Sequence, residues 1–156
     1  MKSSIEIGDY FIRKSLKGFK KYLCNPMKLQ KLVYFSYGWF LYLYDKPLTT
    51  DVVHAAQYGP VFYKLYHETK NSGNNLIKKR IINNNVFYYS LESALLDKVW
   101  DTYKKLDCIQ LANMTHDYGT PWMKLYQDQI EKNGYMREGL VISDESIKEY
   151  FKQKTV

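Results

Sequence analysis

The stretch LQKLVYFSYGWFLYLY, residues 29–44, carries apolar or aromatic side chains on nearly every side of a helix over most of its length. Asn25 precedes it as a helix N-cap and Pro26 as a first helical residue, and Asp-Lys-Pro at 45–47 ends it. The sequence therefore predicts a helix over 26–44. A helix that is apolar on all sides must be covered by others, so we expect it at the centre of a mainly α fold.

Apolar residues at helical spacing and helix-capping residues predict further helices around this one. The first begins with a capping box of Ser3 and Glu6, and the last with Ser143 as N-cap. The remaining boundaries follow from the same signals, and the predicted helices cover 4–23, 60–70, 91–106, 107–114, 121–131 and a final segment after 143. Short β segments are expected at 49–57 and as a small hairpin of 76–82 with 86–89. We therefore predict a mainly α (α+β) fold, a single compact domain over 1–156 with a small β element.

Composition limits the classes of function that the chain can have. With 156 residues, of which 46% are hydrophobic, it is sized for one core. Two cysteines and three histidines show no metal-ligand spacing, and no phosphate loop, nucleophile elbow or paired-carboxylate motif occurs. We therefore expect no enzyme activity, no cofactor and no metal.

Two cysteines are too few for a disulfide framework, so a reducing cytoplasm is the expected location. Hydropathy gives no sign of a membrane span or a signal peptide. The most apolar run, 32–44, has 13 residues, short of the roughly 18 that a membrane-spanning helix needs. Residues 1–10 lack the apolar centre of a signal peptide. We expect neither secretion nor a membrane partner.

The net charge of +7 is concentrated near the N-terminus, because residues 10–44 contain seven cations and no acid. On a helical wheel, Ile12, Leu16, Phe19 and Leu23 form an apolar stripe. A basic face flanks that stripe, made of Arg13, Lys14, Lys17, Lys20 and Lys21. Such a face either attracts phosphate or an acidic protein surface, or is a solvated lysine face without a partner.

Several motifs occur in a fixed order along the chain: LQKLVYF at 29–35, Gly-Trp at 38–39, Lys-Pro-Leu at 46–48, Tyr-Gly-Pro-Val at 58–61 with Tyr66, Leu111 with Thr-His at 115–116, Pro-Trp at 121–122, and a closing helix at 147–151. In this order and spacing, over residues 5–152, the chain resembles the Panacea domain, also called the SocA-like antitoxin or phage-associated GepA-like domain. It departs from the usual pattern at Ala56 and at Ser36-Tyr37.

The resemblance implies an antitoxin of a bacterial or prophage toxin-antitoxin system, which binds a cognate, neighbour-encoded toxin protein directly. Related members deliver a toxin to a cellular protease, so a proteolytic adaptor is one alternative. Some members carry an added DNA-binding domain, for which we expect no room here. A nucleic-acid-binding regulator that uses the basic first helix is the other alternative, although no recognition motif supports it.

Nine residues are candidates for partner contact: Gln30, Lys31, Tyr58, Gly59, Pro60, Val61, Tyr66, His116 and Trp122. Gln30 and Lys31 are expected to face outward, because the leucines on either side of them face the core. The Tyr-Gly-Pro-Val segment is either a structural strand-to-helix joint or the wall of a protein-binding groove. We interpret His116 as a residue that orients a loop, and Trp122 as a core anchor.

Overall fold

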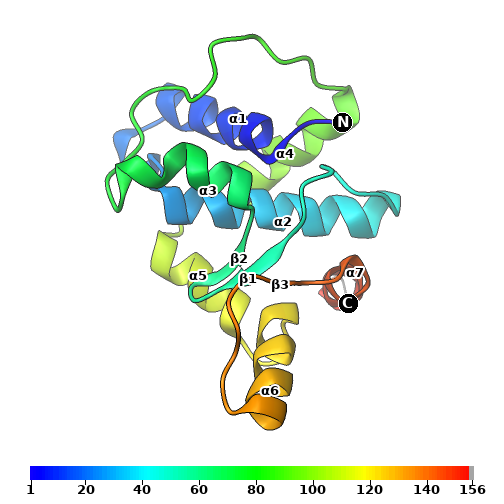
Figure 1. Ribbon diagram of the computed structural model, residues 1–156. Helices are drawn as coiled ribbons and strands as arrows, with labels where there is room; N and C mark the ends of the chain where they lie inside the picture. The colour runs from blue at the N-terminus through cyan, green and yellow to red at the C-terminus, as the bar shows by residue number, and fades with distance from the viewer. Residues whose placement is uncertain (155–156) are drawn as a thin grey trace.

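The computed structural model describes residues 1–154 and places one long helix at the centre of the molecule (Figure 1). This helix is α2 (Pro26–Tyr44), and its N-cap is Asn25, whose side chain accepts a hydrogen bond of 2.9 Å from the backbone amide of Lys28. It contacts α1, α3, α4, α5, α7 and β2. The prediction of a central helix with these bounds is therefore confirmed.

The remaining helices surround α2. Within residues 1–154 they are α1 (Ser4–Lys17), α3 (Tyr63–Thr69), α4 (Ser90–Tyr103), α5 (Cys108–His116), α6 (Pro121–Asn133) and α7 (Asp144–Gln153), with two single-turn 3₁₀ helices, η1 (Lys20–Tyr22) and η2 (Lys70–Ser72). Figure 1 shows α1 and α4 on one side of α2, with the strands, α5 and α7 on the other. Helix α6 projects from the far end of the molecule. No helix within residues 1–154 has the length and apolarity that crossing a membrane requires.

The β element is a three-stranded antiparallel sheet in the order β2-β1-β3, which confirms the predicted α+β class. Its strands are β1 (His54–Ala56), β2 (Gly59–Val61) and β3 (Leu140–Val141). In the pairing of β1 with β2, Ala55 lies opposite Pro60. Pro60 is thus part of a strand, and the helix predicted to begin there starts three residues later. Strand β3, which has two residues, was not predicted.

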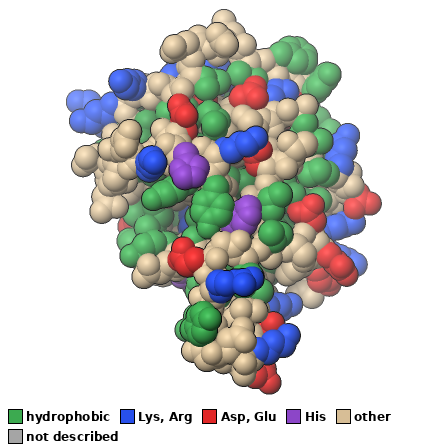
Figure 2. Space-filling model, in the orientation of Figure 1, with side chains coloured by type: hydrophobic (Ala, Val, Ile, Leu, Met, Phe, Trp, Pro, Cys, Tyr) green, Lys and Arg blue, Asp and Glu red, His purple; other side chains and the backbone are tan. Residues whose placement is uncertain are grey.

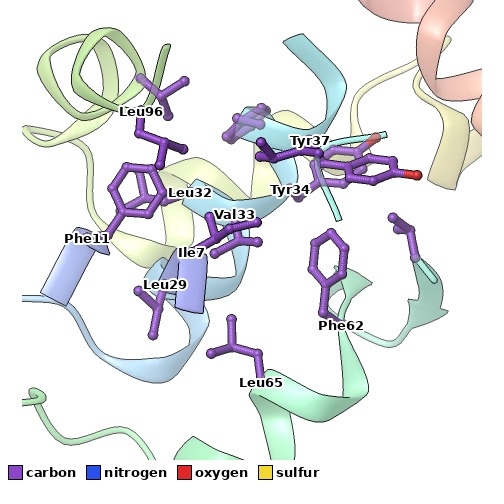
Figure 3. Packing of buried hydrophobic residues seen from close by; sticks show 14 of the residues in the cluster. Ile7, Phe11, Leu29, Leu32, Val33, Tyr34, Tyr37, Phe62, Leu65 and Leu96 are labelled. Atoms are coloured by element: carbon purple, nitrogen blue, oxygen red, sulfur yellow. The ribbon is translucent and has the colours of Figure 1, made fainter. Parts of the chain in front are cut away.

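The core forms where apolar faces meet α2 (Figure 3). Phe11 from α1 and Leu96 from α4 lie beside Leu32 of α2, and all three are fully buried. Burial of a side chain of this size stabilises the fold by about 1.5–3 kcal/mol. Among the glycines of residues 1–154, Gly38 has the least space for a side chain, because a Cβ atom there would lie 2.0 Å from the ring of Phe151. Glycine at this position lets α7 pack directly on α2.

The prediction of one helix over 4–23 is wrong at its C-terminal end. The capping box of Ser3 and Glu6 is present, but α1 ends at Lys17 and Gly18 has extended backbone angles. Because the chain turns at Gly18, Phe19 leaves the predicted apolar stripe and is 71% exposed. Phe19 is spaced from Ile12 as on a helix, but it lies beyond the end of α1.

The hairpin predicted over 76–89 is also wrong, since this segment contains no strand. It is held by contacts with α1. The buried Asp9 carboxylate accepts hydrogen bonds from Arg80 Nη2 at 2.8 Å and from the Ile81 backbone amide at 3.1 Å. Tyr88 Oη donates to the Glu6 carbonyl at 2.6 Å. These long-range bonds take the place of the backbone pairing that a hairpin would provide.

Capping signals located the later helices well. The Asp107 carboxylate accepts from the Gln110 amide at 2.8 Å, and the Ser143 hydroxyl accepts from the Ser146 amide at 3.2 Å. Helix α6 has Pro121 at its first turn, as expected. Helix α5 runs two residues beyond the predicted end, so that His116 is its last residue rather than part of a loop.

Candidate functional site

Gln57 and Tyr58 form a tight turn between β1 and β2 that continues into Gly59 and Pro60 of β2, and we call this stretch the Tyr-Gly-Pro turn. Its geometry requires glycine. Gly59 has φ +114°, a backbone conformation that other residues rarely adopt. A Cβ atom there would lie 2.5 Å from Thr115 Oγ1 and 3.2 Å from Lys31 Nζ. The turn is therefore packed directly against both α5 and α2.

Gln30 fixes the end of β2 through hydrogen bonds to both the backbone carbonyl and the backbone amide of Phe62. Its Nε2 donates to the Phe62 carbonyl at 3.0 Å, and its Oε1 accepts from the Phe62 amide at 2.9 Å. The side chain is only 5% exposed. The prediction that Gln30 faces outward is wrong, because α2 is covered on this side by β2. Its amide acts on β2 as a neighbouring strand would, satisfying groups that burial would otherwise leave unpaired.

Lys31 is 1% exposed, so the prediction that it faces outward is wrong as well. Its Nζ donates to the Pro60 carbonyl at 3.3 Å, and the ion pairs formed among residues 1–154 do not include it. Burial lowers the pKa of Lys31 to about 7. The charged ammonium is therefore disfavoured at this position, and the side chain holds the turn at an electrostatic cost.

Trp122 and His116 support the turn from the other side. Trp122 Nε1 donates to the Ala56 carbonyl at 2.7 Å, and its ring stacks on Tyr126 at 5.3 Å. The His116 ring lies 4.1 Å from the Trp122 ring. Burial, followed by the nearby Lys31 ammonium, lowers the pKa of His116. The indole anchors β1 and the imidazole packs on it, so Trp122 is buried as expected.

An open groove lies beside the turn, with a volume of about 410 Å³. Gln30 and Lys31 contribute to its floor, and Tyr58 and Tyr66 stand at its rim, 56% and 46% exposed. The full lining is Pro26, Met27, Gln30, Lys31, Ala56, Gln57, Tyr58, Val61, Tyr63, Tyr66, Thr69, Lys70, Gly73, Asn74 and Glu138. Figure 2 shows hydrophobic side chains and histidines gathered on this face, over the strands and α3. The groove is thus largely apolar, with polar atoms at a few fixed points.

The structure brings five of the nine candidate residues together in this groove: Gln30, Lys31, Tyr58, Val61 and Tyr66. Gly59 and Pro60 are buried behind it, and His116 and Trp122 lie under the β1–β2 turn without lining it. Sequence reasoning missed Glu138, whose carboxylate accepts from the Gln57 amide at 3.0 Å. Glu138 comes from the segment before β3, and no local signal connects that segment with the turn.

The predicted continuous basic helix face is not present. Arg13 and Lys14 lie on α1, but each forms an ion pair with a carboxylate. Lys14 Nζ is 2.9 Å from Asp97, and Arg13 Nε is 4.0 Å from Asp9. Lys20 and Lys21 belong to η1, beyond the end of the helix. The charge therefore separates into a paired group on α1 and a second group of lysines around Gly18.

Comparison with known proteins gives two matches. The model of the family described as "Antitoxin SocA-like, Panacea domain" matches residues 29–123, more than half of the chain, and this range includes most of the groove. A protein of Caulobacter vibrioides (strain NA1000 / CB15N) named "Antitoxin SocA" is 28% identical over 147 residues, which cover 85% of this chain and 74% of the relative. No solved structure matches.

Proposed function

This chain belongs to the SocA-like Panacea antitoxin family, and from that premise we propose that it neutralises a cognate toxin by direct protein–protein binding. The toxin is bound at the groove beside the Tyr-Gly-Pro turn. Inhibition follows because the bound antitoxin covers a surface that the toxin needs. The single observation that carries the proposal is the position of the groove, which lies among the residues of the family match and has exposed tyrosines at its rim.

The rim tyrosines suit this role because of their size and exposure. Tyr58 and Tyr66 each present a large, rigid ring with a hydroxyl, the kind of side chain that contributes most to protein interfaces. An interface of standard size buries about 1,600 Å² in total, far more than the groove alone. The groove therefore supplies anchoring pockets, while the surrounding surface completes the contact.

The arrangement of polar groups is consistent with binding without catalysis. Gln30 and Lys31, two buried polar side chains of the groove, are hydrogen-bonded to backbone groups of β2 and its end. They hold the shape of the floor. In this proposal no bond of the toxin is made or broken in the groove.

Co-expression tests the proposal. The protein encoded by the adjacent reading frame is produced alone and together with this chain, and we expect growth arrest that co-expression relieves. The doubly substituted Y58A/Y66A chain should bind the toxin at least about 30-fold more weakly, since the loss of even one interface hot spot costs about 2 kcal/mol. Tyr135→Ala is the matched control, because Tyr135 is 64% exposed and does not line the groove.

The outcomes separate this proposal from the other possible functions. Normal binding by Y58A/Y66A with unchanged circular dichroism would exclude the groove as the contact. If the antitoxin relieves growth arrest only in cells with a functional protease, and the toxin disappears, the chain is an adaptor rather than an occluding inhibitor. Sequence-selective DNA binding by the chain alone would favour the regulator.

A further inference from the structure

A basic and aromatic projection, residues 17–22, follows the end of α1, and we call it the Phe19 knob. Gly18 ends the helix in an extended conformation, and Phe19 then projects with 71% of its surface exposed. The ring packs edge-on against Tyr22 at 6.0 Å. Lys21 Nζ lies 5.6 Å from the Phe19 ring and 5.2 Å from the Tyr22 ring, so the aromatic pair and a cation form one unit.

Three lysines of the knob are exposed and form no ion pair with the described residues. Lys17, Lys20 and Lys21 do not occur among the ion pairs of residues 1–154, in contrast to Lys14, which meets Asp97. The sequence around them has no acid from residue 10 to residue 44. An exposed phenylalanine with three such cations within two residues of it in the sequence presents apolar area and positive charge together, and a complementary surface is apolar and acidic.

The knob lies next to one end of the groove. Pro26, a lining residue, follows Tyr22 by only four residues, so their Cα atoms are at most about 15 Å apart. Asn74 also lines the groove, and three residues later the Ile77 amide donates to the Cys24 carbonyl at 2.7 Å. That bond ties the segment after η2 to the three residues that join the knob to Pro26. Knob and groove are thus neighbouring features of the fold.

We propose that the Phe19 knob and the groove together bind one extended segment of the toxin, in which an apolar side chain that enters the groove is flanked by acidic residues that meet the knob. This inference rests on the proposed function and specifies the chemistry of the partner. An extended chain advances about 3.3 Å per residue, so the stretch between the end of the knob and the edge of the groove, at most about 15 Å, is covered by about five residues or fewer. The acidic residues and the apolar anchor are therefore expected within one short segment of the toxin.

The observations favour an acidic protein segment over a phosphate backbone or an anionic bilayer. A nucleic acid would need a continuous basic track, but Arg13 and Lys14 are directed to the carboxylates of Asp9 and Asp97. A bilayer would contact the knob and leave the adjacent groove empty. An extended peptide uses both features at once, the apolar groove for one side chain and the lysines for its carboxylates.

Salt dependence of toxin binding tests the charged half of the proposal. The probe is the protein encoded by the adjacent reading frame, and its Kd is measured from 50 to 500 mM salt. For the K17Q/K20Q/K21Q chain we expect binding at least about tenfold weaker at 50 mM salt and a clearly smaller dependence on salt. The control K46Q/K98Q/K124Q removes the same charge from exposed lysines outside the surface and should bind as the unsubstituted chain does.

Photo-crosslinking tests the geometry. The photoreactive residue p-benzoylphenylalanine replaces Phe19 in one chain and Tyr58 in another, and each is irradiated in complex with the toxin. We expect both to label the same toxin segment, within about ten residues of each other, beside acidic residues. Crosslinks to unrelated segments, or salt dependence unchanged in K17Q/K20Q/K21Q, would overturn the proposal while leaving toxin binding intact.

Two controls separate this inference from its premise. If the unsubstituted chain does not bind the toxin at all, the proposed function fails and the inference fails with it. If the chain alone binds phosphatidylglycerol vesicles or duplex DNA at 150 mM salt, and K17Q/K20Q/K21Q does not, the knob serves lipid or nucleic acid and the protein segment is the wrong occupant.

Discussion

Replacement of Lys31 by methionine should stabilise the protein at low pH and much less at high pH. Lys31 is buried under the Tyr-Gly-Pro turn, and burial lowers its pKa from the ordinary 10.5 to about 7. The unfolded chain keeps this proton up to about pH 10.5, whereas the folded chain loses it near pH 7. Between these values the unfolded state binds more protons, so the contribution of Lys31 to stability rises with pH. Below pH 7 the folded chain carries the full cost of a buried ammonium.

The size of the effect follows from the pKa. Each pKa unit corresponds to about 1.4 kcal/mol, so protonation of Lys31 costs the folded chain on the order of 5 kcal/mol at pH 6. Loss of the hydrogen bond to the Pro60 carbonyl opposes the gain in Lys31→Met by roughly 1 kcal/mol. From pH 7 to pH 9 the lysine chain recovers about 2 to 3 kcal/mol, because two pKa units are crossed.

Urea unfolding followed by circular dichroism at pH 6, 7, 8 and 9 measures the difference in unfolding free energy between K31M and the unsubstituted chain. Groups that titrate alike in both chains cancel in this difference. We expect it to favour K31M at pH 6 and to shrink by about 2 to 3 kcal/mol by pH 9. The control K46M replaces an exposed lysine and should show no such trend. A difference that is equal at pH 6 and pH 9 would refute the reasoning.

Three further substitutions test contacts that hold the fold together. Gly38→Ala places a Cβ atom 2.0 Å from the Phe151 ring, so thermal unfolding should show a loss of about 2 kcal/mol or more, partly recovered when Phe151 is also replaced by leucine. Gly59→Ala introduces a clash at Cβ and places alanine at a positive φ. In urea unfolding it should lower the free energy of unfolding by at least about 1 kcal/mol more than Gly73→Ala does, because at Gly73 φ is positive but the space is open. Arg80→Ala removes the nearer of the two guanidinium groups beside the buried Asp9 carboxylate, and should cost about 1–3 kcal/mol. Hydrogen exchange of residues 76–89 should become faster in that variant, and unchanged exchange there would contradict the assigned role of the ion pair.

Local signals located the central and last helices because their determinants lie within a few residues of one another. The Asn25 side chain starts α2 by accepting a hydrogen bond from a backbone amide that has no partner within the helix, and Pro26 has no amide hydrogen that needs one. The Ser143 side chain caps α7 as Asn25 caps α2. The apolar residues of both helices then follow at helical spacing. Such information is contained in a short window of sequence, and it gave the fold class correctly.

Other features depend on parts of the chain that are far apart in sequence. The path of residues 76–89 is set by Asp9, more than 65 residues away, and β3 has two residues that pair only because β1 lies beside them. The burial of Gln30 and Lys31 has the same origin. Their spacing on α2 placed them opposite the leucines, but β2 covers that side of the helix and takes their hydrogen bonds. Several residues of the groove could therefore be predicted from the sequence, but the directions in which their side chains point could not.

The two backbone-directed hydrogen bonds of Gln30 have a practical consequence for engineering. They fix the end of β2 without help from the side chains at the rim. A combinatorial library that varies Tyr58, Tyr66 and Lys70, all exposed, can therefore be screened for retargeted variants on an unaltered scaffold. In the proposed mode of binding, the varied rim side chains are not those that hold β2, so their replacement should leave the free energy of unfolding nearly unchanged.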